Sequence, residues 1–469
     1  MNLRLWSCLA LFLVPCTVLV SAGQQNTEHL DHEFQAAVAQ YDAGHLPEAA
    51  AALEKLVREV PTNFEVHELL GLIYSEQSQD ALANQHLQTA VRLNPGSAAA
   101  RTNLAANLVH LGKLEDAQAQ LKRAVTLEPR NYDANHNLGE IYVRMGKITD
   151  AVPFLRAAQQ VKPTAYDNGY DLGMAYLATG KLEPGRQLVR SLIKTKDTAE
   201  LHNLLAQIEE KDGNYLVAVN EFETAAHQEP SETNIFDWGS ELLLHRTLEP
   251  AIEVFRKAAE RYPNSPRIAI GLGIALYSRG NYDEALQALL RASDLSPSDP
   301  RCYFFLSKAY DSSPSQADQV IQRFRRFSEL QPANARAYYY YAMSLWKGKR
   351  AQDPDLDRHQ IETLLQKAVS LDPKLADAQL QLGNLYSDQA RYGNAIPQYQ
   401  AALAVNPDLA DAHYRLAQAY VHTSAKEKAQ EQFAIYQKLR AQQMAELDKQ
   451  IADIRQFVYS EEGKVPAQP

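Results

Sequence analysis

Apolar residues recur at helical spacing in pairs of short segments, and residues 132–163 show this most regularly. In the second segment Ala151, Leu155 and Ala158 stand at i, i+4 and i+7, which places them on one face of an α-helix. Gly146 lies between the segments, where glycine supplies the backbone freedom that a helix end needs. Pro163 closes the stretch, since proline lacks an amide hydrogen and disfavours helix in the preceding residue. The pattern therefore predicts a hairpin of two helices.

The predicted hairpin has small side chains where its two helices meet. Gly139, Ala151 and Ala158 permit a close approach, and Leu155 and Tyr142 fill the remaining space. A pair of helices of this size cannot bury its apolar face alone, so it needs similar neighbours on both sides.

The chain supplies those neighbours, because the same residue types return at fixed intervals. The first four terminal prolines are each 34 residues apart, and small residues recur at matching offsets inside the first and second helices. The terminal positions are Pro61, Pro95, Pro129, Pro163, Asp197, Pro230, Pro263, Pro297, Pro332, Pro373 and Pro407.

This pattern resembles the tetratricopeptide repeat, whose period is about 34 residues. The resemblance implies an all-α, right-handed superhelical solenoid of about twelve helix hairpins, with the first helix of each hairpin on the inner face. Each hairpin contacts only its neighbours, so a long chain needs no single large core. The hairpins are expected to begin near residues 30, 64, 98, 132, 166, 199, 232, 266, 300, 335, 376 and 410.

The ends of the chain have patterns of their own. Residues 1–22 combine Arg4, an apolar run and a small-residue end, which predicts a secretory signal peptide and an exported protein, periplasmic or extracellular. An uncleaved membrane anchor and lipid attachment at Cys16 are the alternatives. No later stretch is apolar enough to span a membrane. We assign residues 23–29 to a loose lead-in, 30–441 to the repeat array, 442–460 to an extended capping helix and 461–469 to a disordered tail.

The capping helix carries a narrow apolar seam with spacings of three and four residues, formed by Met444, Leu447, Ile451, Ile454 and Val458. Capping of the array is the preferred interpretation, and self-association through the seam is the alternative.

The fifth hairpin and the seventh to tenth hairpins depart from the repeat. In the fifth, Pro184-Gly185 stands where the alanine of the second helix belongs, which predicts a late or distorted start of that helix. In the tenth, the spacing from Pro332 to Pro373 is 41 residues, and the insertion falls in the polar stretch Lys347–Arg358. Such insertions map to loops and are either functional or tolerated surface additions.

Composition and motifs restrict the kind of function. The formal charge of −10 argues against a nucleic-acid partner, which requires a strongly basic face. Cys302 is the only cysteine after residue 22, so we expect no internal disulfide. A partly buried structural thiol is the preferred interpretation, and an intermolecular bridge is the alternative. We find no catalytic motif, no metal-ligand spacing and no cofactor loop, and therefore predict a protein without enzymatic activity, metal or cofactor.

The strongest candidate site is an apolar strip on the predicted first helices of hairpins seven to ten. Residues at matching offsets form ladders there, and large exposed apolar patches often mark binding sites. Burial of these side chains by lateral packing is the alternative. We call this set the aromatic strip: Phe236, Leu243, Ile270, Ile274, Tyr277, Phe304, Tyr339, Met343 and Trp346.

A change of charge accompanies the strip. The second residue of the N-terminal hairpins is usually acidic (Asp31, Glu65, Asp133, Asp167 and Glu200), whereas hairpins eight to ten have arginine. Three guanidinium groups in register could bind an acidic segment, and pairing with nearby acids is the alternative. The three are Arg267, Arg301 and Arg336.

A polar ladder lies in the N-terminal hairpins, where Asn103, Asn137 and Asp171 share one offset. It is similar to the asparagine ladder in the repeats of the O-linked N-acetylglucosamine transferase, which implies contact with the backbone of an extended peptide; a satisfied structural amide is the alternative. The lysine clamp of chaperone-binding family members is missing, because its first offset holds Phe34, Glu68, Thr102, His136 and Tyr170.

These features together predict a protein-binding scaffold that holds an extended or helical segment of another protein in its concave groove. A role in the assembly of cell-envelope complexes follows from the resemblance to secreted family members. The alternative from another class is a glycan-binding or transferase-associated protein.

Overall fold

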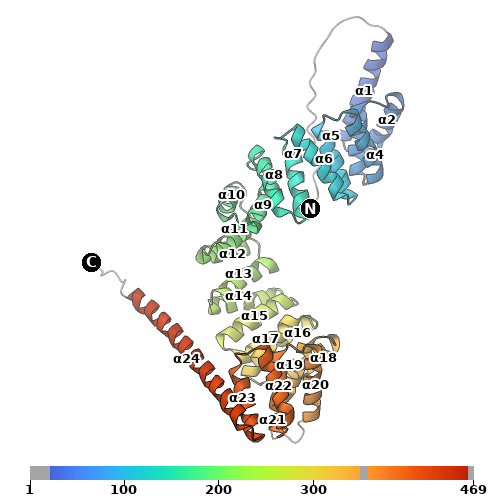
Figure 1. Cartoon of the computed structure of the whole chain (residues 1–469). Helices are drawn as coiled ribbons and strands as arrows, with labels where there is room; N and C mark the ends of the chain where they lie inside the picture. Colours follow the sequence, from blue (N-terminus) through green and yellow to red (C-terminus); the bar gives the residue numbers. More distant parts are fainter. Residues whose placement is uncertain (1–21, 349–356, 463–469) are drawn as a thin grey trace, which may run out of the picture. The chain divides into compact units, whose positions relative to one another are not determined.

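The computed structural model describes residues 22–348 and 357–462, which form 24 α-helices and no strand. Residues 1–21 of the expected signal peptide, most of the Lys347–Arg358 insertion and most of the 461–469 tail lie outside these residues. The prediction of an all-α fold built from helix hairpins is confirmed within the described part of the chain. The chain divides into two compact parts, Met1–Asn234 and Ile235–Pro469 (Figure 1), which we call the N-terminal half and the C-terminal half.

The N-terminal half contains six hairpins, each formed by an odd-numbered helix and the even-numbered helix that follows it. The helices are α1 (Ala22–Asp42), α2 (Leu46–Glu59), α3 (Phe64–Glu76), α4 (Asp80–Leu93), α5 (Ala98–His110), α6 (Leu114–Leu127), α7 (Tyr132–Arg144), α8 (Ile148–Val161), α9 (Tyr166–Ala178), α10 (Leu182–Thr195), α11 (Ala199–Lys211) and α12 (Tyr215–Gln228).

Three of these first helices start at a residue whose side chain caps the helix. Asn63, Ser97 and Asn131 precede α3, α5 and α7, and each side chain accepts a hydrogen bond from the backbone amide three residues later. Such a bond satisfies one of the amides that a helix start leaves without an intrahelical partner. The hairpin turn needs a residue with positive φ, which Gly146 provides at +72°.

The two helices of a hairpin pack through the small residues of the repeat. Ala151, Leu155 and Ala158 of α8 are completely buried, as the helical spacing predicts. The second helices from α2 to α10 each also contact the first helix of the next hairpin, so the apolar residues of the first hairpins join one continuous core. No single hairpin encloses this core, which agrees with a stack of mutually dependent repeats.

The C-terminal half follows the same plan, with α13 crossing the boundary between the two halves. Its helices are α13 (Glu232–Leu244), α14 (Leu248–Arg261), α15 (Pro266–Arg279), α16 (Tyr282–Leu295), α17 (Pro300–Ser312), α18 (Ala317–Leu330), α19 (Ala335–Gly348), α20 (Arg358–Leu371), α21 (Ala376–Asp388), α22 (Tyr392–Val405), α23 (Ala410–His422) and α24 (Lys426–Glu462).

Three expectations about helix boundaries need correction or comment. The late or distorted start of the fifth hairpin's second helix is wrong, because α10 begins at Leu182, at the same offset as α8. Pro184 lies in the first turn, where its missing amide hydrogen costs no intrahelical bond. Gly185 allows close packing, because a Cβ there would lie 3.2 Å from Cδ1 of Ile208.

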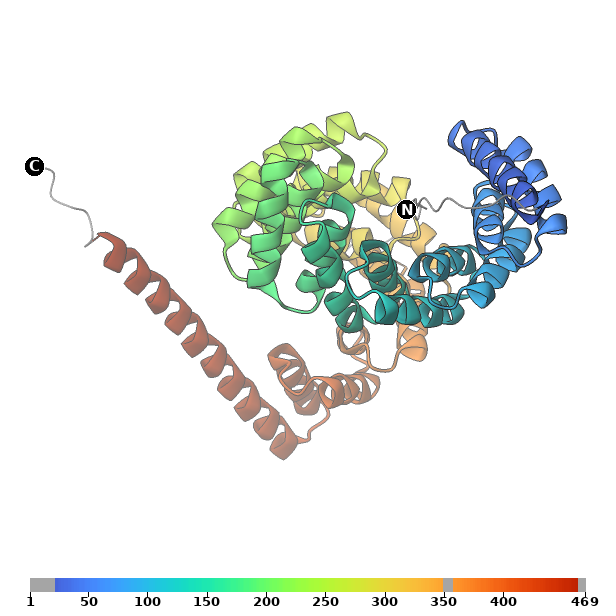
Figure 2. The same cartoon turned by 90° about the horizontal axis from the view of Figure 1, so that it is seen from above.

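The lead-in expected at residues 23–29 is also not a loose segment, since these residues belong to α1. The stretch has no proline, and its two glutamines and its glutamate favour helix. At the other end, residues 442–460 continue the second helix of the last hairpin without a break (Figure 2). Within the described residues, we find no helix with the length and apolarity required to cross a membrane.

Candidate partner-binding faces

The aromatic strip lies in the C-terminal half, on α13, α15, α17 and α19. The last three of these helices contact one another in succession, so their side chains form one surface. Burial varies greatly along the strip: Ile270 is 8% exposed, whereas Phe304 is 39% exposed. The other members are half-buried: Phe236, Leu243, Ile274, Tyr277, Tyr339, Met343 and Trp346.

Lateral packing accounts for the partial burial at the end of the strip. Tyr339 and Trp346 pack against a core cluster that contains Ala342, Leu365 and Leu382. Both aromatic residues therefore help to hold the tenth and eleventh hairpins together. Phe304 is the most accessible member of the strip, and the Lys308 ammonium lies 5.8 Å from the centre of its ring.

The three arginines beside the strip all have partners within the chain. Arg267 lies over the Phe236 ring, 3.8 Å from its centre, and its guanidinium is 3.3 Å from a carboxylate oxygen of Asp237. Arg301 binds Asp299, the residue that caps its own helix, with a nitrogen–oxygen distance of 2.6 Å. Arg336 bonds to the side chain of Tyr340. These arginines thus stabilise the chain locally, and Arg301 keeps a largely exposed side chain beside Phe304.

The polar ladder of the N-terminal half lies on α5, α7 and α9, whose successive members contact one another (Figure 1). Asn103 donates a hydrogen bond of 3.2 Å to Oε1 of Glu68, on the preceding first helix. Asn137 is 8% exposed, and its amide forms no hydrogen bond with any described residue. Asp171 is half-buried and forms neither a hydrogen bond nor an ion pair within the described chain. The three ladder positions therefore differ in how well they are satisfied.

Several carboxylates surround this ladder and are partly removed from water. Burial raises the pKa of Glu68 to about 7, although the hydrogen bond from Asn103 lowers it. Burial also raises the pKa of Asp171 to about 6, with a further increase from the negative charges of Glu140 and Asp167. We call the set Glu68, Asn103, Asn137, Glu140 and Asp171 the acidic face. The repeat pattern indicates the two asparagines and Asp171 of this face, but it does not indicate the roles of Glu68 and Glu140.

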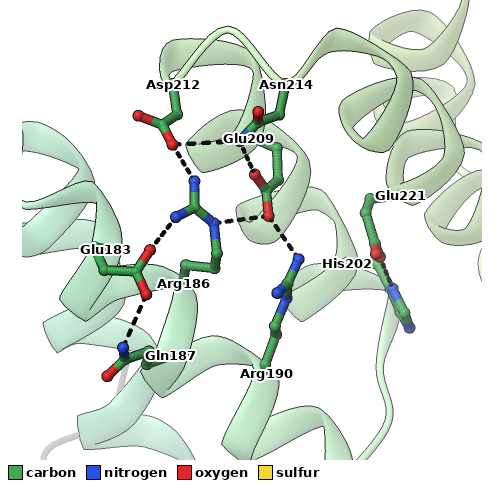
Figure 3. Close-up of polar contacts among 9 residues, drawn as sticks. All are labelled: Glu183, Arg186, Gln187, Arg190, His202, Glu209, Asp212, Asn214 and Glu221. Atoms are coloured by element: carbon green, nitrogen blue, oxygen red, sulfur yellow. Dashed lines mark hydrogen bonds and ion pairs between the residues drawn. The ribbon is translucent and has the colours of Figure 1, made fainter.

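A further polar cluster lies between α10 and α11, and sequence reasoning missed it (Figure 3). The carboxylate of Glu209 is 1% exposed and accepts hydrogen bonds of 2.9 Å from both Arg186 and Arg190. Arg186 also binds Glu183 and Asp212, and Asn214 donates to the second oxygen of Glu209 at 2.8 Å. Because the residues satisfy one another and Glu209 is buried, the cluster joins two adjacent hairpins and offers little to a ligand.

Comparisons with known proteins agree with the architecture. Three family models match the chain: one described as tetratricopeptide repeat at residues 34–98 and 236–300, one as TPR repeat at 107–146 and 383–423, and another as tetratricopeptide repeat at 76–126 and 144–208. Together these matches cover more than half of the sequence. No curated protein sequence matches the chain.

Three solved structures that match the chain are distant from it in sequence. Naa15/Naa10 bound to HypK-THB shares 17% identity, with 87% of this chain and 68% of that chain covered and a TM-score of 0.40. The APC/C hetero-tetramer Cut9-Hcn1 shares 15% identity, with coverage of 89% and 95% and a TM-score of 0.37. YrrB, a TPR protein with an unusual peptide-binding site, shares 17% identity, with coverage of 39% and 96% and a TM-score of 0.38.

Proposed function

Because the chain belongs to the tetratricopeptide repeat family, we propose that it is a protein-binding scaffold that holds an extended or helical segment of a partner against its first helices. Proteins built from these repeats are generally non-enzymatic scaffolds, and a non-enzymatic role is part of the proposal. The observation that supports it most directly is Phe304, a large aromatic side chain that is 39% exposed on a first helix. Aromatic side chains at the centre of a contact surface commonly contribute much of its binding energy.

The surroundings of Phe304 also suit a partner segment. Arg301 stands one helical turn before Phe304 and Lys308 one turn after it, so two cations flank the exposed ring. An apolar side chain of the partner would cover the ring, while polar or acidic groups would meet the two cations. Such a mixture of an apolar centre and a charged edge is typical of protein interfaces.

The location of the protein forms a second part of the proposal. The signal-like pattern of residues 1–22 supports export, and we infer that the partner belongs to a cell-envelope complex whose assembly the scaffold assists. Fractionation of cells followed by N-terminal sequencing of the exported chain tests this part. A protein that begins at Met1 and stays in the cytoplasm would contradict it.

The binding role is tested by affinity capture from the native envelope fraction with the wild-type chain and with Phe304→Ala. We expect the specific partners identified by mass spectrometry to be reduced at least about tenfold for the variant, as for a central aromatic contact. Leu330→Ala is the matched control, because Leu330 is 50% exposed but lies on a second helix. Equal recovery with both variants and the wild type would remove the aromatic strip as the binding surface.

A further inference from the structure

A pair of histidines joins the two helices of the second hairpin. The Nδ1 atoms of His67 on α3 and His86 on α4 lie 3.0 Å apart, and the centres of the two rings are 5.2 Å apart. Both side chains are largely shielded from water, since His67 is 7% exposed and the His86 side chain 13%. Nε2 of His67 lies 3.1 Å from the carbonyl oxygen of Pro61, and Nε2 of His86 lies 3.6 Å from the carboxylate of Glu54 on α2. The pair therefore connects α3, α4 and the first hairpin.

The partners of the two rings determine where their protons lie. A carbonyl oxygen can only accept a hydrogen bond, so Nε2 of His67 carries a hydrogen. In a neutral His67, Nδ1 is then the acceptor, and Nδ1 of His86 donates to it. One added proton can bind Nε2 of His86, beside Glu54. A second proton must bind Nδ1 of His67, where it would set two N–H groups against each other and break the contact between the rings.

The surroundings of His86 also oppose its protonation. Burial lowers the pKa of His86 below its ordinary value of 6.5, the neighbouring His67 lowers it further, and the carboxylate of Glu54 raises it only in part. Tyr74 of α3 donates a hydrogen bond of 2.8 Å to that carboxylate. A histidine whose pKa is lowered by folding contributes fully to stability above pH 6.5, and this contribution is lost as the pH falls below that value.

Charged groups on α5, which also packs against α4, have other partners. A guanidinium nitrogen of Arg101 donates to Gln120 at 2.9 Å, and Nδ1 of His110 lies 3.4 Å from the carboxylate of Asp80. Glu54 is thus the carboxylate that faces His86, and its effect is smaller than those of burial and of His67.

Other hairpins have the same connection with different side chains. The residue six positions after the terminal proline bonds to the carbonyl of that proline and to the residue 19 positions further along, on the second helix. The corresponding sets are Arg101, Pro95 and Gln120 in the third hairpin and His413, Pro407 and Gln432 in the twelfth. A glutamine has no titrating group, so in these two hairpins a proton cannot place two cations against each other.

The sixth hairpin has a version that responds to protons in the opposite direction. His202 of α11 lies between two carboxylates, with Nε2 2.9 Å from Asp197 and Nδ1 bonded to Glu221. A protonated imidazole donates to both carboxylates, whereas a neutral one has a single N–H. Mild acid therefore favours this connection and opposes the one between His67 and His86.

We propose that the His67–His86 pair is an acid-sensitive latch, so that mild acidification separates α4 from α3 and from the first hairpin and loosens this end of the repeat array. The third hairpin, which has the arginine–glutamine pair, remains packed. The latch needs no partner protein, so this inference goes beyond the proposed scaffold function.

Hydrogen–deuterium exchange of the purified chain, followed by mass spectrometry at pH 7.5 and 5.0, tests the latch. Each exchange rate is divided by the intrinsic rate at the same pH, which gives the protection of each helix. We expect the protection of α3 and α4 to fall at least about tenfold more than that of α5 and α6. A group that is protonated preferentially in the open state shifts the opening equilibrium up to about tenfold per pH unit below its pKa.

Two variants show whether the histidine pair causes the difference. His86→Gln gives the second hairpin the histidine–glutamine pair of the twelfth and should remove most of the pH dependence. His32→Gln is the matched control, because His32 is exposed on α1 and its replacement should leave the wild-type behaviour intact.

The outcomes are decisive even if one variant is unstable. If circular dichroism shows that His86→Gln does not fold, the double variant His67→Arg with His86→Gln introduces the pair of the third hairpin, which does not titrate between pH 5 and 8. An equal fall of protection in α3–α4 and α5–α6 of the wild type would overturn the latch. So would an undiminished pH dependence in the folded variant. The capture experiment with Phe304→Ala is independent of both results.

Discussion

Leu155 packs directly on the backbone of Gly139, so closely that a Cβ on Gly139 would lie 2.5 Å from Cγ of Leu155. The same contact recurs between Gly71 and Leu87 and between Gly273 and Leu289, each at 2.5 Å. Glycine is required at these places because it allows two helices of one hairpin to approach. A repeat built on this contact can be stacked many times with the same spacing.

We predict that Gly139→Ala destabilises the protein by about 1–2 kcal/mol. Overpacking of a core typically costs about 1–3 kcal/mol, and the better helix propensity of alanine returns up to about 1 kcal/mol. Chemical denaturation followed by circular dichroism measures the change. Gly393→Ala is the control, since Gly393 is also helical but has nothing within 4 Å of its Cβ position. A destabilisation of equal size in both variants would contradict the packing argument.

The cluster around Glu209 gives a second prediction, because its carboxylate is buried and depends on its cations (Figure 3). Arg186→Met should destabilise the protein by about 3–5 kcal/mol, the usual result when a buried charge loses its partner. Arg190→Met should cost much less, because the Arg190 side chain is 52% exposed and Arg186 remains in place. Thermal denaturation of the two variants makes the comparison, and similar melting temperatures would argue against an essential role for Arg186.

Cys302 should be chemically inert in the folded protein. Its side chain is fully buried, and burial together with the nearby charge of Asp299 raises the pKa of the thiol to about 12. The thiolate is the reactive form, so a raised pKa keeps the group protonated and unreactive at neutral and mildly alkaline pH. In a chain with Cys8 and Cys16 replaced by serine, Ellman's reagent at pH 8 should react slowly before unfolding and rapidly after it. Fast reaction of the folded protein would show that the thiol is accessible.

The periodic residues of the sequence are sufficient to predict the all-α fold and its helix hairpins. The first helices from α3 to α23 begin at the residues that the repeat predicts, among them Phe64, Ala98 and Tyr132. They agree because each hairpin repeats the same kind of turn and the same packing between its two helices. Propensity alone gives the wrong expectation for Pro184-Gly185, because it ignores where in the helix the two residues lie. Proline in the first turn of a helix is tolerated, and glycine in a crowded contact is an advantage.

The candidate faces were harder to predict, since burial depends on neighbours that the repeat pattern does not specify. Ile270 and Phe304 share an offset, but one is almost buried and the other is exposed. Asn103 and Asn137 also share an offset, yet only Asn103 has a glutamate on the preceding first helix to bond with. Glu209 could not be recognised because its two arginines lie 19 and 23 residues away on another helix.

Ionisation of Glu68 opposes folding. Burial raises its pKa from 4.5 to about 7, so the folded state holds the proton more tightly than the unfolded state does. This contribution to stability is complete below pH 4.5 and is lost as the pH rises through 7. Glu68→Gln keeps an acceptor for Asn103 but cannot ionise, so it should be more stable than the wild type by about 3 kcal/mol at pH 8 and nearly equal at pH 4.5. Denaturation at both pH values tests this, with Glu59→Gln on the exposed surface of α2 as the control. A difference that is the same at both pH values would mean that the substitution acts through packing and not through the charge.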